Sequence, residues 1–110
     1  MQNSNRTPKA PVTLSAEAKN LWRRLLSEYE LNDSAALALL ANALQAFDRM
    51  REAQALLARD GICPPDRFGQ PRAHPAVLIE RDSRAAMLKH LGALHLDVEP
   101  VLSPGRPVGS

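Results

Sequence analysis

The side chains that could act as catalysts or metal ligands are few and widely spaced. Three histidines, His74, His90 and His95, show no His-x-x-x-His spacing, and the single cysteine, Cys63, cannot form a Cys-x-x-Cys pair. No Gly-x-x-x-x-Gly-Lys loop is present to hold the phosphates of ATP. The sequence therefore predicts no metal site, no cofactor and no enzymatic activity.

Positive side chains are better placed to contact a nucleic-acid backbone. Lys19 and Arg23 are four residues apart, so they share one face of an expected helix, and only Glu17 is acidic before Glu28. Sequence-neutral contact with phosphates needs no more than such a surface, although a solvated helix face would have the same pattern. The predicted DNA-binding residues of this first cluster are Arg6, Lys9, Lys19, Arg23 and Arg24.

A second basic cluster lies further along the chain, with acidic residues between its members. Asp66, Glu80 and Asp82 weaken its net charge. In a symmetric oligomer, however, a modest patch is repeated, and several weak phosphate contacts add up to useful affinity. Its predicted DNA-binding residues are Arg67, Arg72, Arg81 and Arg84, with His74 beside them.

The composition limits the fold to one small domain. The chain has 110 residues, a net charge of +2, 45% hydrophobic residues and only 4% aromatic residues. A domain of this size can bury only a small core, and alanine-rich helices pack closely. No apolar run approaches the roughly 20 residues that span a bilayer, so we expect a soluble cytoplasmic protein without a membrane partner.

The helical signals predict an all-α fold. Ser15 is a candidate N-cap for a helix over 16–29, and Asp33 or Asn32 caps a long helix over 34–60, which ends at Gly61. These two helices should form a helical hairpin or a helix-turn-helix. After a proline-rich loop at 62–75, a third helix is expected over 75–91. The predicted organisation is a flexible basic arm (1–14), a helical domain (15–92) and an extended tail (93–110).

The long helix carries two apolar stripes, which suggests an oligomer. One stripe, with Leu37, Leu40, Leu44 and Phe47, can face the first helix. The other is rich in small residues, so either a neighbouring subunit or the third helix of the same chain can cover it. The predicted oligomer-interface residues on this second stripe are Leu39, Ala43, Ala46, Met50, Ala53 and Leu57.

The order of landmarks resembles that of the small-subunit family of phage terminases. It includes Leu21-Trp22, the long helix with Asp48, His74-Pro75, Leu91-Gly92 and the segment 94–100. The resemblance implies a helical, ring-forming protein in the cytoplasm of the infected bacterium. It would bind double-stranded viral DNA and stimulate a large subunit that holds the ATPase and nuclease. The alternating apolar residues Leu94, Leu96 and Val98 are the predicted contact with that large subunit.

Two other functions fit the same helices. A small helix-turn-helix regulator would bind a short palindrome as a dimer, and a helical adaptor would show no salt-sensitive DNA binding. The size of the oligomer and the salt dependence of DNA binding separate these alternatives.

Overall fold

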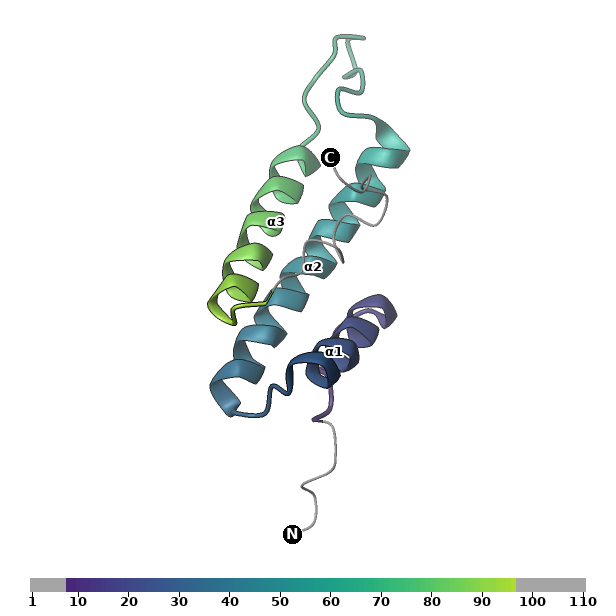
Figure 1. The fold of residues 1–110 in the computed structure, drawn as a ribbon. Helices are drawn as coiled ribbons and strands as arrows, with labels where there is room; N and C mark the ends of the chain where they lie inside the picture. Colours follow the sequence, from purple (N-terminus) through teal and green to yellow (C-terminus); the bar gives the residue numbers. More distant parts are fainter. Residues whose placement is uncertain (1–7, 97–110) are drawn as a thin grey trace, which may run out of the picture.

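The computed structural model describes residues 8–96 and confirms the all-α fold. It contains α1 (Ala16–Tyr29), α2 (Ser34–Asp60) and α3 (Ala76–Ala93). The bounds of α1 and α2 are those predicted, and α3 ends two residues later than expected. Figure 1 shows α2 at the centre, with α3 running back along its length and α1 beside its N-terminal half. Two of the predicted contact residues, Arg6 and Val98, lie outside the described residues.

Side-chain caps fix the starts of the first two helices. The Ser15 hydroxyl accepts the Ala18 N–H at 3.0 Å, and the Asp33 carboxylate accepts the Ala36 N–H at 2.7 Å. Each bond satisfies a backbone donor that has no partner inside its helix. The sequence therefore specifies both starts locally, as predicted.

Polar contacts also hold the beginning of α1 on the middle of α2. The Ser15 backbone N–H and hydroxyl both donate to the Asp48 carboxylate, at 2.8 and 2.5 Å. Arg51, one turn further along α2, forms an ion pair with Glu17 at 3.0 Å. These contacts set the direction of α1 along α2 and place its opposite, charged face toward solvent.

Both apolar stripes of α2 are buried within the chain itself. Leu40, Leu44 and Phe47 are buried in the core, in one cluster with apolar residues of α1. On the second stripe, Ala43, Ala46, Met50 and Ala53 are at most 2% exposed, while Leu39 and Leu57 are half-buried. Gln54 donates to Glu80 of α3 at 3.1 Å, which fixes α3 on this side of α2. The prediction that a neighbouring subunit packs on this stripe is therefore wrong for the four buried residues, because α3 approaches closely over their small side chains.

The described part of the predicted arm, residues 8–14, packs against α1. The Trp22 indole N–H donates to the Pro8 carbonyl at 2.8 Å, and Leu14 is only 4% exposed. Burial of Leu14 and the satisfied indole nitrogen both favour this docked path. The prediction of a free arm is wrong for this stretch, because the buried Trp22 ring needs a hydrogen-bond acceptor.

α3 ends in a Schellman motif. The Leu96 N–H bonds to the Leu91 carbonyl at 3.2 Å, the His95 N–H bonds to Gly92 at 2.9 Å, and His95 has φ 60°. Leu94 and Leu96 pack against the core at the base of this turn. The extended pattern predicted from Leu94 onward is therefore wrong for residues 94–96, because the pair Leu91 and Leu96 closes the helix end.

The proline-rich stretch forms a hairpin, where the sequence predicted only an irregular loop. Two backbone hydrogen bonds join its sides. The Arg72 N–H donates to the Pro64 carbonyl at 3.1 Å, and the His74 N–H donates to the Ile62 carbonyl at 2.8 Å. A turn with Gly69 at φ 80° closes the hairpin, and Figure 1 shows the hairpin extending beyond the ends of α2 and α3. Ile62, at the base of the hairpin, is 65% exposed.

Candidate nucleic-acid interface

The first basic cluster lies on the solvent face of α1. Arg23 is exposed and donates to Asn20 at 2.6 Å, while Lys19 is half-buried one turn earlier. Arg24 pairs with Glu28 at 3.8 Å, and both side chains are more than half exposed. An exposed pair of this length contributes little, so Arg24 keeps most of its capacity to bind a phosphate.

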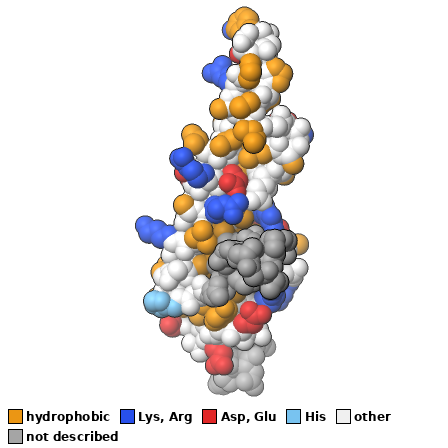
Figure 2. All heavy atoms as spheres, turned by 45° about the horizontal axis from the view of Figure 1, so that its top comes forward, with side chains coloured by type: hydrophobic (Ala, Val, Ile, Leu, Met, Phe, Trp, Pro, Cys, Tyr) orange, Lys and Arg blue, Asp and Glu red, His pale blue; other side chains and the backbone are white. Residues whose placement is uncertain are grey.

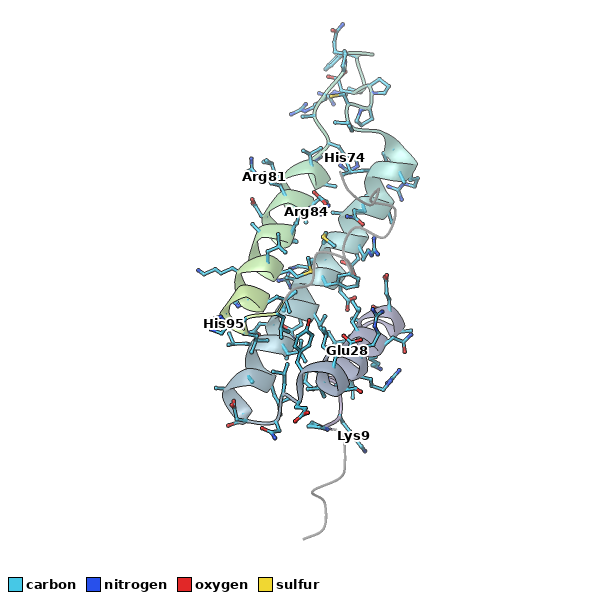
Figure 3. The ribbon with its side chains drawn as sticks, viewed as in Figure 1. Lys9, Glu28, His74, Arg81, Arg84 and His95 are labelled. Carbon is cyan, nitrogen blue, oxygen red and sulfur yellow. The ribbon has the colours of Figure 1, made fainter. Side chains whose placement is uncertain are left out.

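The docked stretch before α1 adds one cation to this surface. The bond from Trp22 to the Pro8 carbonyl places the Lys9 backbone beside α1, and Lys9 itself is exposed. Figure 3 shows Lys9 at the end of the molecule where α1 lies. Lys9, Lys19 and Arg23 form no ion pair within residues 8–96. The structure therefore places Lys9 close to the cations of α1.

The second basic cluster is divided between α3 and the hairpin. On α3, Arg84 bonds to the Glu80 carboxylate and Arg81 pairs with Asp82 at 3.4 Å. Burial favours the neutral form of Glu80, but hydrogen bonds from Gln54 and Arg84 outweigh it and lower the pKa of Glu80. Arg84 is thus committed to its own chain, and Figure 3 shows Arg81 and Arg84 together on α3.

Arg67 and Arg72 stand apart from this acidic neighbourhood. Both are exposed on the hairpin, and neither forms an ion pair in the described part of the chain. Arg67 lies over the ring of Phe68, with 5.0 Å between its guanidinium carbon and the ring centroid. Figure 2 shows apolar and basic side chains together on this projecting end. The hairpin is therefore a second basic surface, separate from that of α1.

The two ring nitrogens of His74 are both occupied at the base of the hairpin. Nδ1 accepts the Ala76 N–H at 3.0 Å, so Nε2 carries the hydrogen and donates to Asp60 at 2.9 Å. Hydrogen bonds from Arg59 and then from His74 hold the pKa of Asp60 well below its usual range. The pair borders a hollow of about 370 Å³, but neither nitrogen is open to act as a base or a metal ligand.

The remainder of residues 8–96 offers no other kind of site to consider. No group of three or more His, Cys, Asp or Glu side chains in that range is arranged to hold a metal ion. No helix in the same range is long and apolar enough to cross a membrane.

Sequence reasoning missed Phe68, which is 73% exposed at the tip of the hairpin. The available signal was Asp66-Arg67-Phe68-Gly69, because an aspartate followed three residues later by glycine is typical of a tight hairpin turn. In the structure, one Asp66 carboxylate oxygen accepts the N–H groups of Phe68 and Gln70, at 2.8 and 3.0 Å. The turn was not predicted, because the many prolines around it indicate an irregular loop.

The fold and the charges together define a class: a small all-α protein with exposed cations on its helices and on a projecting hairpin. Comparison with known protein families shows which family this class of protein represents. The family model described as phage terminase, small subunit, matches residues 18–99, and the chain belongs to this family. No curated protein and no solved structure matches the chain. Membership confirms the resemblance noted in the sequence and indicates a role in phage DNA packaging, in which small subunits are generally regulatory.

Proposed function

We propose that this protein is a non-catalytic subunit that binds double-stranded viral DNA and stimulates the terminase large subunit. It would act in the cytoplasm of the infected bacterial host. The observation that carries the proposal is the family match over 18–99, because it covers α2, α3 and nearly all of α1.

The first proposed DNA contact is the solvent face of α1. Lys19 and Arg23 lie four residues apart and have no acidic partner within residues 8–96, so both can bind phosphates. Replacing both by alanine removes two such contacts. The slope of log affinity against log salt should then become shallower by about 2 for each bound chain.

The test is a fluorescence anisotropy titration with a labelled duplex at several salt concentrations. Lys89→Ala is the control for loss of a positive charge, because Lys89 is exposed and forms no ion pair in the described part of the chain but lies on α3. A double variant at Lys19 and Arg23 that keeps the wild-type slope would remove α1 from the DNA contact.

The second element of the proposal is a closed homo-oligomeric ring. With the small-residue stripe of α2 buried, the exposed apolar face of α3 is the better candidate for contact between subunits. Leu78 and Leu88 are 54% and 43% exposed, and Ala85 lies between them at helical spacing. Exposed apolar residues repeated along one helix face are typical of an association surface.

Light scattering behind a sizing column tests this surface. The wild-type mass should exceed that of a dimer, and glutamate at both Leu78 and Leu88 should lower the mass without loss of helical circular dichroism. A wild-type monomer or dimer would contradict the ring, and an unchanged mass in the double variant would exclude this face.

The third element is contact with the large subunit through the segment 94–107. Leu94 and Leu96 support the core of their own chain, so a deletion that includes them would also destabilise the fold. Deletion of residues 97–110 keeps the end of α3 and is the cleaner test. The truncated protein should keep its oligomeric mass and its DNA affinity but lose stimulation of the large subunit's ATPase. Normal stimulation would refute the assignment.

A further inference from the structure

The hairpin at 62–74 is the part of the described chain that the proposed function leaves least explained. Its strands are joined by backbone hydrogen bonds, and Pro65 and Pro71 face each other in an isolated bridge between them. The two prolines have fixed φ angles, so little conformational freedom is left on either side of the turn. The hairpin is thus an ordered projection, held at its base by the bond of His74 to Asp60.

The turn presents an aromatic side chain to solvent in a fixed position. Gly69 donates to the Asp66 carbonyl at 2.9 Å, and the Asp66 side chain holds the Phe68 N–H at 2.8 Å. The Phe68 ring is 73% exposed at the tip, so it buries little apolar area and contributes almost nothing to the stability of its own chain. An ordered turn that displays such a ring is pre-organised for contact with a partner.

The charge around the ring favours a polyanion as that partner. Arg67 stacks on the ring, and Arg72 follows on the returning strand. The carboxylate of Asp66 is engaged by two backbone N–H groups, and that of Asp60 by Arg59 and His74. Positive groups therefore dominate the outer part of the hairpin, which favours a polyanion such as the phosphate backbone of DNA.

We propose that this hairpin enters the minor groove of the DNA and that Phe68 inserts between two base pairs, bending the duplex. An apolar wedge flanked by arginines is the chemistry by which minor-groove proteins unstack a base step, and a two-stranded ribbon is one of the shapes that reach into a groove. Arg67 and Arg72 bind the phosphates or the groove floor on either side of the wedge. The inference rests on the proposed DNA binding and adds a mode of contact to it.

The wedge makes predictions that plain phosphate binding does not. Phe68→Ala removes no charge, so the salt dependence of DNA binding should stay unchanged. The affinity should fall about fivefold, because the stacking supplied by Phe68 is partly offset by the unstacking of the base step. The bend, expected to be about 20–90°, should be lost. Phe68→Leu should keep part of the bend, because leucine is also an effective wedge.

The experiment measures energy transfer between the ends of a duplex of about 30 base pairs that contains flexible TA steps. A 2-aminopurine beside one TA step reports unstacking in the same sample. Full-length wild type, Phe68→Ala and Phe68→Leu are compared with Ile62→Ala, a control that removes an exposed apolar side chain from the base of the hairpin. Circular dichroism confirms that each variant is folded.

The expected result is that wild type and Ile62→Ala bend the duplex and brighten 2-aminopurine, while Phe68→Ala binds without either effect. Equal bending by wild type and Phe68→Ala would overturn the wedge and leave the proposed DNA binding intact. No DNA binding by wild type at any salt concentration would instead refute the proposed function, and the wedge with it. Loss of large-subunit binding in Phe68→Ala, with unchanged bending, would reassign the tip to a protein partner.

Discussion

The polar contact between α1 and α2 offers a quantitative test of the fold. Asp48 lies in the middle of α2, and its carboxylate accepts both the backbone N–H and the hydroxyl of Ser15. The same hydroxyl caps α1 by accepting the Ala18 N–H. Asp48 also places a negative charge at the positive end of the α1 dipole. Replacing Asp48 therefore weakens the start of α1 and its attachment to α2 together.

The size of the effect follows from these bonds. A hydrogen bond to a charged group contributes about 1.5–3 kcal/mol to the free energy of unfolding. Because Ser15 and Asp48 are partly open to solvent, the contribution of each of their two bonds should be at or below the lower limit of this range. Asp48→Ala, which loses both bonds, should lower the free energy of unfolding by about 2 kcal/mol. Asp48→Asn keeps one acceptor oxygen for the Ser15 N–H, so we expect a loss of about 1 kcal/mol.

Urea unfolding followed by Trp22 fluorescence measures both losses, because Trp22 is 3% exposed in the α1 interface. The matched control is Glu52→Ala, since Glu52 lies one turn beyond Asp48, is exposed and forms no hydrogen bond within residues 8–96. Its effect should stay within about 0.5 kcal/mol. If Asp48→Ala lowered the free energy of unfolding no more than Glu52→Ala does, α1 would be held by its apolar face alone, and the reasoning would be refuted.

Three further substitutions test other parts of the account. Ala46→Leu should destabilise the chain by about 1–3 kcal/mol in urea, because α3 leaves no space at this 1% exposed site; unchanged stability would restore the stripe as a surface for another subunit. Glu30→Gly should raise stability by about 1 kcal/mol in thermal unfolding, since Glu30 ends α1 at φ 54°, where glycine is unstrained; a lower melting temperature would contradict this. The folded-state pKa of Glu80 is lowered, so its stabilisation is present above the unfolded value of about 4.3 and is lost as the pH falls through the folded value. Glu80→Gln should therefore reduce the fall in urea midpoint on acidification below about pH 4.3, and an unchanged acid profile would show that Glu80 is not responsible.

The helices could be predicted from the sequence because their signals are local. Ser15 and Asp33 cap the first two helices as expected, and a run without proline or glycine specifies α2. The positive φ of Gly61 at the end of α2 follows in the same way from the residue type. The basic face of α1 could also be predicted, because a spacing of four residues determines which side chains share a helix face.

The packing could not be predicted, because it depends on which surfaces of one chain meet. A stripe of alanines and Met50 suits a helix of the same chain as well as that of a neighbour, and the structure shows α3 of the same chain packed along α2. Residues 8–14 pack on α1 because the buried Trp22 indole N–H takes the Pro8 carbonyl as its acceptor. The sequence alone does not show which carbonyl will serve as that acceptor. His95 takes a left-handed conformation that a sequence pattern assigns to glycine, so the end of α3 lies beyond Gly92.

The hairpin shows a different limit. Prolines generally break regular structure, yet at Pro65 and Pro71 no backbone donor is needed for the bonds that close the hairpin. The tight turn could have been identified from Asp66 and Gly69, but the exposure of Phe68 could not. That exposure results from how far the hairpin extends past α2 and α3.

The most direct test of the account is the ATPase activity of the large terminase subunit from the same phage, measured with viral DNA in the presence and absence of this protein. The account predicts that the full chain stimulates ATP turnover, that deletion of residues 97–110 abolishes the stimulation, and that the chain alone hydrolyses no ATP. Turnover that is the same with and without the protein, under conditions in which both bind the DNA, would contradict the proposed function.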